Sequence, residues 1–378
     1  ARRVAAQIAE GSAERDRERR LPFAEVELLS QSGLWGITVP KAYGGPGVSN
    51  VTFAEVVKTL SAADASIGQI PQNHFANVEE IRLVGTEAQK KFFFERIMAG
   101  DRLGNAAIEA GGKTARDVRT RAVPDGDDLI LTGEKFYCTG ALFAHWVPVK
   151  ALDEGDKPVM IIVDKNSPGL TVVDDWSGFG QRTTASGTVK LANVRVPKSH
   201  LFDGQQAYRT HTTRGPFSQL IHVAIDVGIA LAAIEETARF LRSESRPWID
   251  AHVERATDDP LTIAAVGDLQ YRYHAAEALL ERAARQMDRA MEEQAENEVI
   301  RAAVTVAEAK IGATEIALLA TNKLFELAGT KSTLARYGLD RHWRNARVHT
   351  LHDPVRWKYH LIGNYYLNGV NPPRHAWS

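Results

Sequence analysis

Two histidines near the C-terminal end of the chain could carry out proton-transfer or metal chemistry. His349 and His352 lie three residues apart in the segment RNARVHTLHDP, and Asp353 follows directly. A helix through this segment would place both imidazoles on one face. A histidine can release and recover a proton near neutral pH, and histidines with a carboxylate can also ligate a metal. The third possibility is structural, in which both side chains only bridge this segment to its neighbours.

The metal interpretation lacks further ligands. The sequence offers no clear remote motif that would add a ligand to His349, His352 and Asp353, and Cys138 is the only cysteine. One cysteine forms neither an internal disulfide nor a thiolate-rich zinc site. We therefore expect no metal, which leaves proton transfer and a structural role open, and we expect a reducing cytoplasm as the compartment.

The bulk composition argues against two classes of partner. The 46 basic and 47 acidic residues leave a net charge of −1, whereas a nucleic-acid-binding surface needs an excess of basic residues. No run of 18 or more apolar residues is present, so we expect no membrane span. The first twenty residues are charged and Ala-rich and contain no apolar signal core. A length of 378 residues exceeds that of one ordinary core, which indicates two or three domains.

The spacing of apolar residues divides the chain into three regions. Residues 1–104 show helical spacing, as in FAEVVKTLSAADAS, and are predicted to form an N-terminal helical domain. Residues 105–215 contain short β-branched segments such as VMIIVD, separated by turns, and are predicted to form a β-domain. Residues 216–378 return to helical spacing without the sustained heptads of a coiled coil, which favours a packed bundle. Gly329 is predicted to end one long helix.

Five motifs, in this order along the chain, resemble those of the acyl-CoA dehydrogenase superfamily. They are GLWGITVPKAYGG, LTGEKFYCTGA, GFGQRTTASGTVKLANVRVP, ELAGTKS and DRHWRNARVHTLHDP. The resemblance covers nearly the whole chain. It implies an α+β fold with an N-terminal helical domain, a β-barrel-like middle domain that lies along a flavin, and a C-terminal four-helix bundle. It also implies a homotetramer in which the flavin phosphates lie at a subunit interface.

The resemblance also implies which residues contact the flavin. In isolation, an aromatic residue and a threonine would be ordinary strand residues, and each arginine would more often form a surface ion pair. With all five motifs present, the flavin role is favoured. The implied contacts are Tyr137 and Thr139 on the flavin strand, Trp176 and Arg182 at the mouth of the pocket, and Arg246, Gly329, Thr330 and Lys331 at the phosphates.

The C-terminal motif departs from the dehydrogenase pattern. In dehydrogenases the Arg-rich segment is followed by Tyr-Glu-Gly-Thr, whose Glu is often the catalytic base, but this chain has His352, Asp353 and Pro354. Aspartate is one methylene shorter than glutamate and would fall about 1 Å short of the base position. HDP, together with GNA at residues 104–106 and YCTGALFA at residues 137–144, resembles instead the two-component flavin monooxygenases of sulfur acquisition.

That subgroup implies roles for four residues. His352 would supply and recover a proton at the site where oxygen reacts, and His349 would orient or tune it. Asn105 would lie beside the flavin and the oxygen site. Cys138 stands where relatives have a serine near the reactive edge, and a thiol is a weaker hydrogen-bond donor than a hydroxyl.

The cofactor would come from outside. No GxGxxG motif follows a strand, so a nicotinamide site is not expected, and reduced flavin would be supplied by a separate reductase. The subgroup favours FMN, with FAD as the alternative. The sequence therefore predicts a monooxygenase that uses reduced flavin and O2 on a small organosulfur compound. Two alternatives are an FAD-dependent acyl-CoA dehydrogenase and a non-catalytic flavin-binding protein of the same fold.

Overall fold

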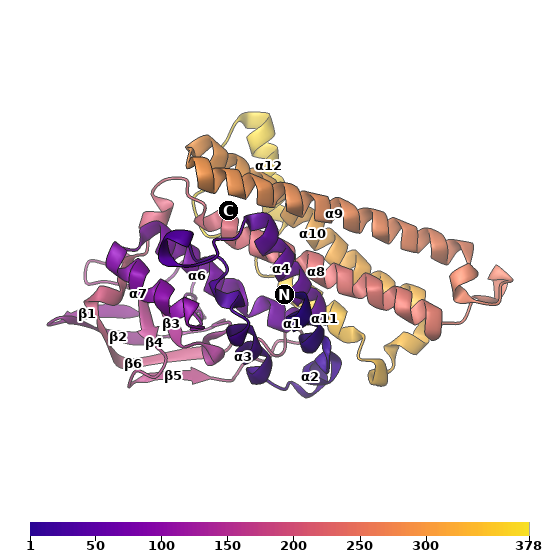
Figure 1. Cartoon of the computed structure of the whole chain (residues 1–378), viewed down its shortest axis with the longest axis horizontal. Helices are drawn as coiled ribbons and strands as arrows, with labels where there is room; N and C mark the ends of the chain where they lie inside the picture. The colour runs from indigo at the N-terminus through magenta and orange to yellow at the C-terminus, as the bar shows by residue number, and fades with distance from the viewer. Residues whose placement is uncertain (378) are drawn as a thin grey trace.

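The structure, a computed structural model, describes residues 1–377. Helices of the N-terminal region pack between a β-sheet and a bundle of long helices (Figure 1). Local sequence fixes where two of these helices start. Ser49 caps the helix that begins at Asn50, and Thr86 forms a capping box with Gln89 at the helix that begins at Glu87. The helices are α1 (Arg2–Ala9), α2 (Ser12–Glu18), α3 (Phe23–Gln31), α4 (Asn50–Ala63), α5 (Ala65–Gln69), α6 (Pro71–Val84) and α7 (Glu87–Met98).

The middle region is one seven-stranded sheet with the order β5-β6-β2-β1-β3-β4-β7. All strand pairs are antiparallel except β1 with β3. Alternating apolar residues of β2, β3, β4 and β6 form its core. The strands are β1 (Arg121–Asp125), β2 (Asp128–Lys135), β3 (Trp146–Leu152), β4 (Pro158–Asp164), β5 (Leu170–Val173), β6 (Thr188–Pro197) and β7 (Leu201–Asp203).

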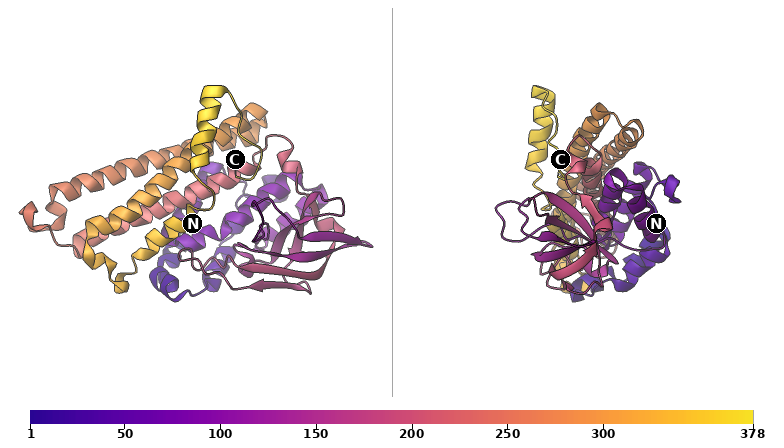
Figure 2. Two further views of the ribbon diagram at one scale, coloured as in Figure 1. Left: turned by 180° about the vertical axis from the view of Figure 1, so that it is seen from behind. Right: turned by 90° about the vertical axis from the view of Figure 1, so that its left-hand side faces the viewer.

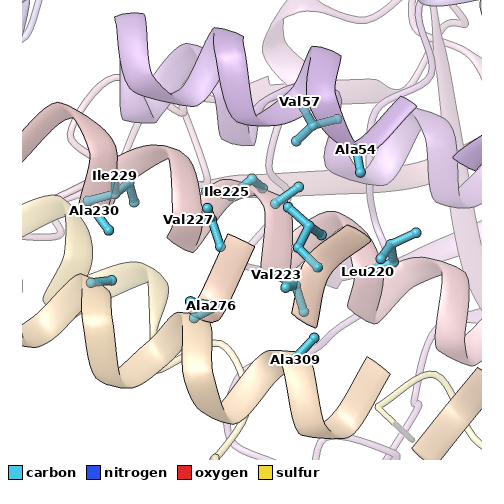
Figure 3. Packing of buried hydrophobic residues seen from close by; sticks show 14 of the residues in the cluster. Ala54, Val57, Leu220, Val223, Ile225, Val227, Ile229, Ala230, Ala276 and Ala309 are labelled. Carbon is cyan, nitrogen blue, oxygen red and sulfur yellow. The ribbon is translucent and has the colours of Figure 1, made fainter. Parts of the chain in front are cut away.

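Three long helices, α8 (Arg214–Ser243), α9 (Pro260–Glu293) and α10 (Glu296–Ala328), form the bundle with α4 against them, and α8 and α10 end side by side. Small residues let the helices approach closely, and Figure 3 shows Val227 of α8 beside Ala276 of α9. α10 ends where predicted, since Gly329 has a φ of +73°. The shorter α11 (Asp340–His349) packs against α8, and α12 (Arg356–Asn368) packs against α10 at the edge of the molecule (Figures 1 and 2).

Helix α8 is the centre of the molecule. It is long and apolar enough to cross a membrane by composition, but 89% of its most apolar window is buried within the protein. Its interior nevertheless carries His222 and Asp226, which are both fully buried. Buried polar groups are costly unless they are paired, so these two residues need partners from other helices.

His349 and His352 do not share a helical face, because no helix runs through both of them. α11 ends at His349, and the chain turns before His352, whose backbone N–H donates to the His349 carbonyl oxygen at 3.0 Å. Pro354 follows, and a proline restricts the preceding backbone to non-helical conformations. His349 is therefore the last residue of a helix, whereas His352 lies in the turn that follows it.

A buried histidine predicts how stability depends on pH. His74 of α6 donates from Nε2 to the Trp35 carbonyl oxygen and accepts at Nδ1 from the Leu103 amide, and burial lowers its pKa to about 4. The unfolded chain takes up this proton below about pH 6.5 and the folded chain does not. Stability from this residue is therefore present above pH 6.5 and lost as the pH falls towards 4, by about 1.4 kcal/mol per pH unit.

Urea unfolding between pH 7 and pH 4.5 measures this slope. His74→Gln keeps one donor and one acceptor but does not titrate, so its slope should be smaller by about one proton. Equal slopes for the two proteins would contradict the assignment.

Candidate functional site

A small cavity lies where the sheet, α6, the start of α8 and the segment after α11 meet. Its volume is about 130 Å³, and Asn105 and His352 both line it. Asn105 comes from the segment that follows α7, and its Nδ2 donates to the Tyr137 carbonyl oxygen at 3.1 Å. The structure thus brings together the proposed proton-transfer histidine and the proposed oxygen-site asparagine. The other lining residues are Gln72, Asn73, Asn77, Glu80, Ala107, Ile108, Pro148, Lys150, Met160, Gly204, Tyr208, Arg214, Ser218, Ala376 and Trp377.

Asp353 orients His352. The two side chains join through Nδ1 and Oδ1 at 3.1 Å, and the Lys358 ammonium lies 3.9 Å from the other carboxylate oxygen. Burial alone would raise the pKa of Asp353, but the hydrogen bond from His352 and the nearby lysines hold it far below its usual range. The ionised carboxylate keeps the proton on Nδ1 of His352, which leaves Nε2 as the atom that can exchange a proton with a ligand.

Behind His352 lies a chain of buried groups. The His222 ring packs against the His352 ring with centroids 3.8 Å apart, and His222 Nδ1 lies 3.0 Å from His349 Nε2. The other nitrogen of His349 donates to Asp226, and Lys310 of α10 pairs with that carboxylate at 2.9 Å. His349 therefore reaches His352 through His222, rather than by direct contact as its spacing had indicated.

The electrostatics of these buried side chains determine which tautomer each histidine adopts. Burial lowers the pKa of His222 and His349, so both rings are neutral near pH 7. Burial opposes the charge on Asp226, but Lys310 and His349 hold its pKa below the usual value. A carboxylate can only accept, so each ring directs its Nδ1 proton towards Asp226, and the buried Nε2 of His222 is an acceptor without a partner in residues 1–377.

Sequence reasoning missed His222, Asp226 and Lys310. A signal for the first two existed, because a histidine and an aspartate spaced four residues apart interrupt the otherwise apolar segment FSQLIHVAIDVGIA. Such a pair on a buried helical face requires a polar partner. Nothing local in the sequence pointed to Lys310 as that partner.

The predicted flavin strand presents both a ring and hydroxyl groups. Tyr137 has a φ of +58° and is 52% exposed, and its ring lies 6.2 Å from that of Trp176. The Thr139 hydroxyl bonds to that of Ser186 at 2.6 Å, which holds it in place. The predicted strand position of Tyr137 and Thr139 is wrong, because β2 ends at Lys135 and both residues lie in the turn that follows it. The structure therefore places Tyr137, Thr139 and Trp176 at one end of the sheet.

Other groups at this end suit a planar heteroaromatic ring. Phe179 and Trp343 are partly exposed and stack with centroids 6.0 Å apart. The buried carboxamide of Gln181 has no hydrogen-bond partner for either side-chain atom within the described part of the chain. The backbone N–H of Gln181 donates to Asn345 of α11 at 2.6 Å, which ties the sheet to the helix beside it. Exposed rings and unsatisfied polar atoms together fit the face and edge of a flavin.

Cys138 is buried in the segment that follows β2. Its backbone N–H donates to the Gly187 carbonyl oxygen at 3.1 Å, and burial raises the pKa of the thiol to about 12. It is therefore a neutral thiol and contributes packing rather than an ionised group.

The remaining predicted cofactor residues lie elsewhere. Arg246, Gly329, Thr330 and Lys331 gather where α8 and α10 end, away from the sheet (Figure 1). The Ser245 hydroxyl bonds to the Ala328 carbonyl oxygen at 3.2 Å, and Lys331 pairs with Glu244 at 2.7 Å. α8 is 30 residues long, so this end lies about 45 Å from its start beside the cavity. One chain cannot bring both groups of residues to one flavin.

Arg182 lies beside the N-terminal helices, and its guanidinium contacts the Arg17 carbonyl oxygen at 3.5 Å. It belongs to the segment between β5 and β6 that also carries Trp176.

Residues 1–377 contain no group of three His, Cys, Asp or Glu side chains placed to hold a metal ion.

A three-region fold with a flavin-compatible site between sheet and bundle defines a class of flavoenzymes, and sequence profiles identify it. The acyl-CoA dehydrogenase N-terminal domain matches residues 1–101, the middle domain residues 108–194, and the C-terminal domain residues 220–357. The chain therefore belongs to the acyl-CoA dehydrogenase family, and the predicted fold is confirmed.

Similar proteins narrow the class. Dibenzothiophene monooxygenase of Rhodococcus erythropolis is 33% identical, covering 95% of this chain and 90% of that protein. The probable FMNH2-dependent monooxygenase SfnC of Pseudomonas putida is 32% identical over 98% and 95% of the two chains.

Solved structures agree. TdsC of Paenibacillus sp. A11-2 with FMN and indole has a TM-score of 0.95 at 31% identity, covering 100% of this chain and 98% of that one. The methanesulfinate monooxygenase MsuC of Pseudomonas fluorescens has a TM-score of 0.93 at 32% identity and the same coverage. The predicted enzyme class, a flavin-dependent monooxygenase, is confirmed by these relatives, and the predicted cofactor, FMN, is the one bound in TdsC.

Proposed function

We propose that this chain is a monooxygenase that uses reduced FMN and O2 to oxygenate a small organosulfur compound. The observation that carries the proposal is the pair of His352 and Asp353 facing a cavity that also contains Asn105. Its relatives act on dibenzothiophene or methanesulfinate, both organosulfur compounds. A separate flavin reductase would supply the reduced cofactor, in a cytoplasmic setting.

The residues of this chain have separate tasks in that reaction. Reduced FMN supplies the two electrons that activate O2. Tyr137 and Thr139 would position its ring, and Asn105 would hold the oxygen end through its carboxamide. His352 holds or moves a proton at Nε2, with Asp353 fixing its orientation. The Trp377 carbonyl oxygen accepts a hydrogen bond from Lys358. This contact keeps the C-terminal segment around Ala376 and Trp377 over the cavity and helps to exclude water.

The dehydrogenase alternative needs a free carboxylate base. Asp353 is 5% exposed, bonded to His352, and held ionised with a pKa far below its usual range. A carboxylate stabilised in this way is a weak base for removing a proton from carbon. The geometry therefore favours the monooxygenase.

Anaerobic mixing of the protein with reduced FMN, then addition of O2 and a sulfur compound, tests the function directly. An oxygenated product in proportion to flavin oxidised supports it. Flavin reduction by an acyl-CoA, with FAD bound at one per subunit, would support the dehydrogenase instead. We also expect reduced FMN to bind more tightly than oxidised FMN.

We further propose a homotetramer in which one subunit contributes the distal phosphate residues to its neighbour's flavin. The support is the separation of Arg246 and Lys331 from the sheet, which one chain cannot bridge. Apolar residues also remain exposed near that end, where Trp248, Ile249 and Leu261 are at least 70% exposed. Such a concentration of apolar surface is typical of an interface.

Arg246→Ala tests this arrangement. Loss of one charge-assisted contact to phosphate should weaken the binding of reduced FMN by about 10- to 100-fold, while the secondary structure stays unchanged. Arg272→Ala is the matched control, because Arg272 is an exposed arginine of α9 whose guanidinium pairs with Asp268 on the same helix. Equal FMN affinity for Arg246→Ala and the control, measured by anaerobic fluorescence titration, would contradict the predicted phosphate contact.

A further inference from the structure

The cavity beside His352 contains a lysine without a partner. Lys150 lies on β3, and its side chain lines the cavity. Within residues 1–377 no hydrogen bond or ion pair is formed by its ammonium group. Burial lowers the pKa of Lys150, opposed by the nearby Glu80 carboxylate. An unpaired, partly buried ammonium costs free energy, so its presence indicates a ligand that compensates the charge.

A second cation lines the same cavity. Arg214, the first residue of α8, is 8% exposed, and its Nε donates to Glu80 at 2.8 Å. Its Nη1 is buried and has no partner in the described chain. Among the lining residues that the structure describes, Glu80 is the only carboxylate, so two cations face one anion there. A bound anion would balance this charge.

Neutral donors surround the two cations. Tyr208 and Ser218 line the cavity, and burial raises the pKa of Tyr208 to about 12, so its hydroxyl stays protonated. The Ser218 hydroxyl accepts from Gln72, which leaves its own proton available. Phenol, hydroxyl and guanidinium donors together suit the oxygens of a small oxyanion.

The size of the cavity limits the ligand. Its volume of about 130 Å³ lies below the roughly 300 Å³ at which sites for drug-sized ligands begin. A molecule of a few heavy atoms fits such a space, whereas a polycyclic one would have to displace the tail around Trp377.

We propose that this cavity binds a small alkanesulfinate, with its oxygens at Lys150 and Arg214 and its sulfur towards His352 and Asn105. This inference rests on the monooxygenase function, and it selects a sulfinate because that anion keeps a lone pair on sulfur. The sulfur gains one oxygen atom from O2, forming an S–O bond as the O–O bond breaks. The second oxygen leaves as water. O2 takes two electrons from the sulfur, and two electrons and two protons from reduced FMN, so the products are a sulfonate, FMN and water.

Calorimetric titration with methanesulfinate, using flavin-free protein and protein with oxidised FMN, tests the site without turnover. Lys150→Met should weaken binding by about 10- to 100-fold, and Lys150→Arg should restore most of it. Lys190→Met on the exposed side of β6 is the matched control and should bind as the wild type does. No binding in either form, or equal binding by Lys150→Met and the wild type, would overturn the proposal.

Turnover with reduced FMN and O2 separates this inference from the proposed function. The wild type should favour methanesulfinate over neutral dimethyl sulfone, and Lys150→Met should raise KM for the sulfinate while changing kcat much less. Lys150-dependent binding without any oxygenated product would overturn the monooxygenase and leave the oxyanion site. Turnover of a neutral sulfur compound, with no effect of Lys150 on any substrate, would overturn the oxyanion site and leave the monooxygenase.

Discussion

His352→Ala should abolish most product formation while leaving the binding of reduced FMN nearly intact. The imidazole is positioned by Asp353 and presents Nε2 to the cavity, so its removal deletes a proton donor that only the oxygen chemistry needs. General acid–base groups contribute about 10²–10⁴-fold, and the loss should fall in that range. Reduced flavin should still be consumed by O2, and hydrogen peroxide should replace the oxygenated product. Single-turnover product analysis with a peroxide assay measures both quantities.

Two variants control for the position of the change. His274 is an exposed residue of α9 beside Tyr273 and lines neither the cavity nor the groove next to His352, so His274→Ala should keep nearly normal coupling. Asp353→Ala should reduce the yield less than His352→Ala does, because it removes only the group that orients the ring. If Asp353→Ala abolished an acyl-CoA-dependent activity and His352→Ala were silent, Asp353 would be a dehydrogenase base.

Asp226→Asn should destabilise the protein by about 3–5 kcal/mol, because it leaves the Lys310 ammonium buried without a counter-charge. Both side chains are at most 1% exposed, so solvent cannot screen the remaining charge. The asparagine also weakens the hydrogen bond that sets the tautomer of His349. Urea unfolding at pH 7 measures the loss, and Asp268→Asn on the exposed surface of α9 should cost less than about 1 kcal/mol.

A double variant separates stability from function. Asp226→Leu with Lys310→Met removes both charges, and replacing a buried pair by apolar residues is often neutral or stabilising. We expect this protein to regain most of the stability that Asp226→Asn loses, with a remaining cost of about 1–3 kcal/mol because the buried Nδ1–H of His349 has no acceptor. Its product yield should still fall, because the His222 and His349 tautomers lose their anchor. A product yield equal to that of the wild type would show that the buried side chains from His222 to Lys310 only support the fold.

The sequence by itself determined the order of the three regions and several local boundaries. Helical spacing, β-branched segments and the glycine at residue 329 are local properties, and each acts within a few neighbouring residues. The pairing of His352 with Asp353 was also local, because the two residues are adjacent and their side chains need no other element to meet. The five motifs then indicated the family and the flavin strand.

The tertiary structure decided which distant side chains meet. His222 lies between His349 and His352 because α8 passes behind the end of α11, and Lys310 reaches Asp226 because α10 packs along α8. These contacts depend on how long helices dock, which spacing along one segment does not encode.

The cavity beside His352 and the cluster around Arg246 and Lys331 also could not be predicted from local sequence. Lys150 and Arg214 look like ordinary charged residues in the sequence, and only the meeting of β3 with the start of α8 makes them two cations in one small space. Conversely, Arg246 and Lys331 belong to motifs that imply one cofactor, yet a long rigid helix holds them far from the sheet. Residue type is read from the sequence, whereas burial, charge balance and distance arise only when the elements pack.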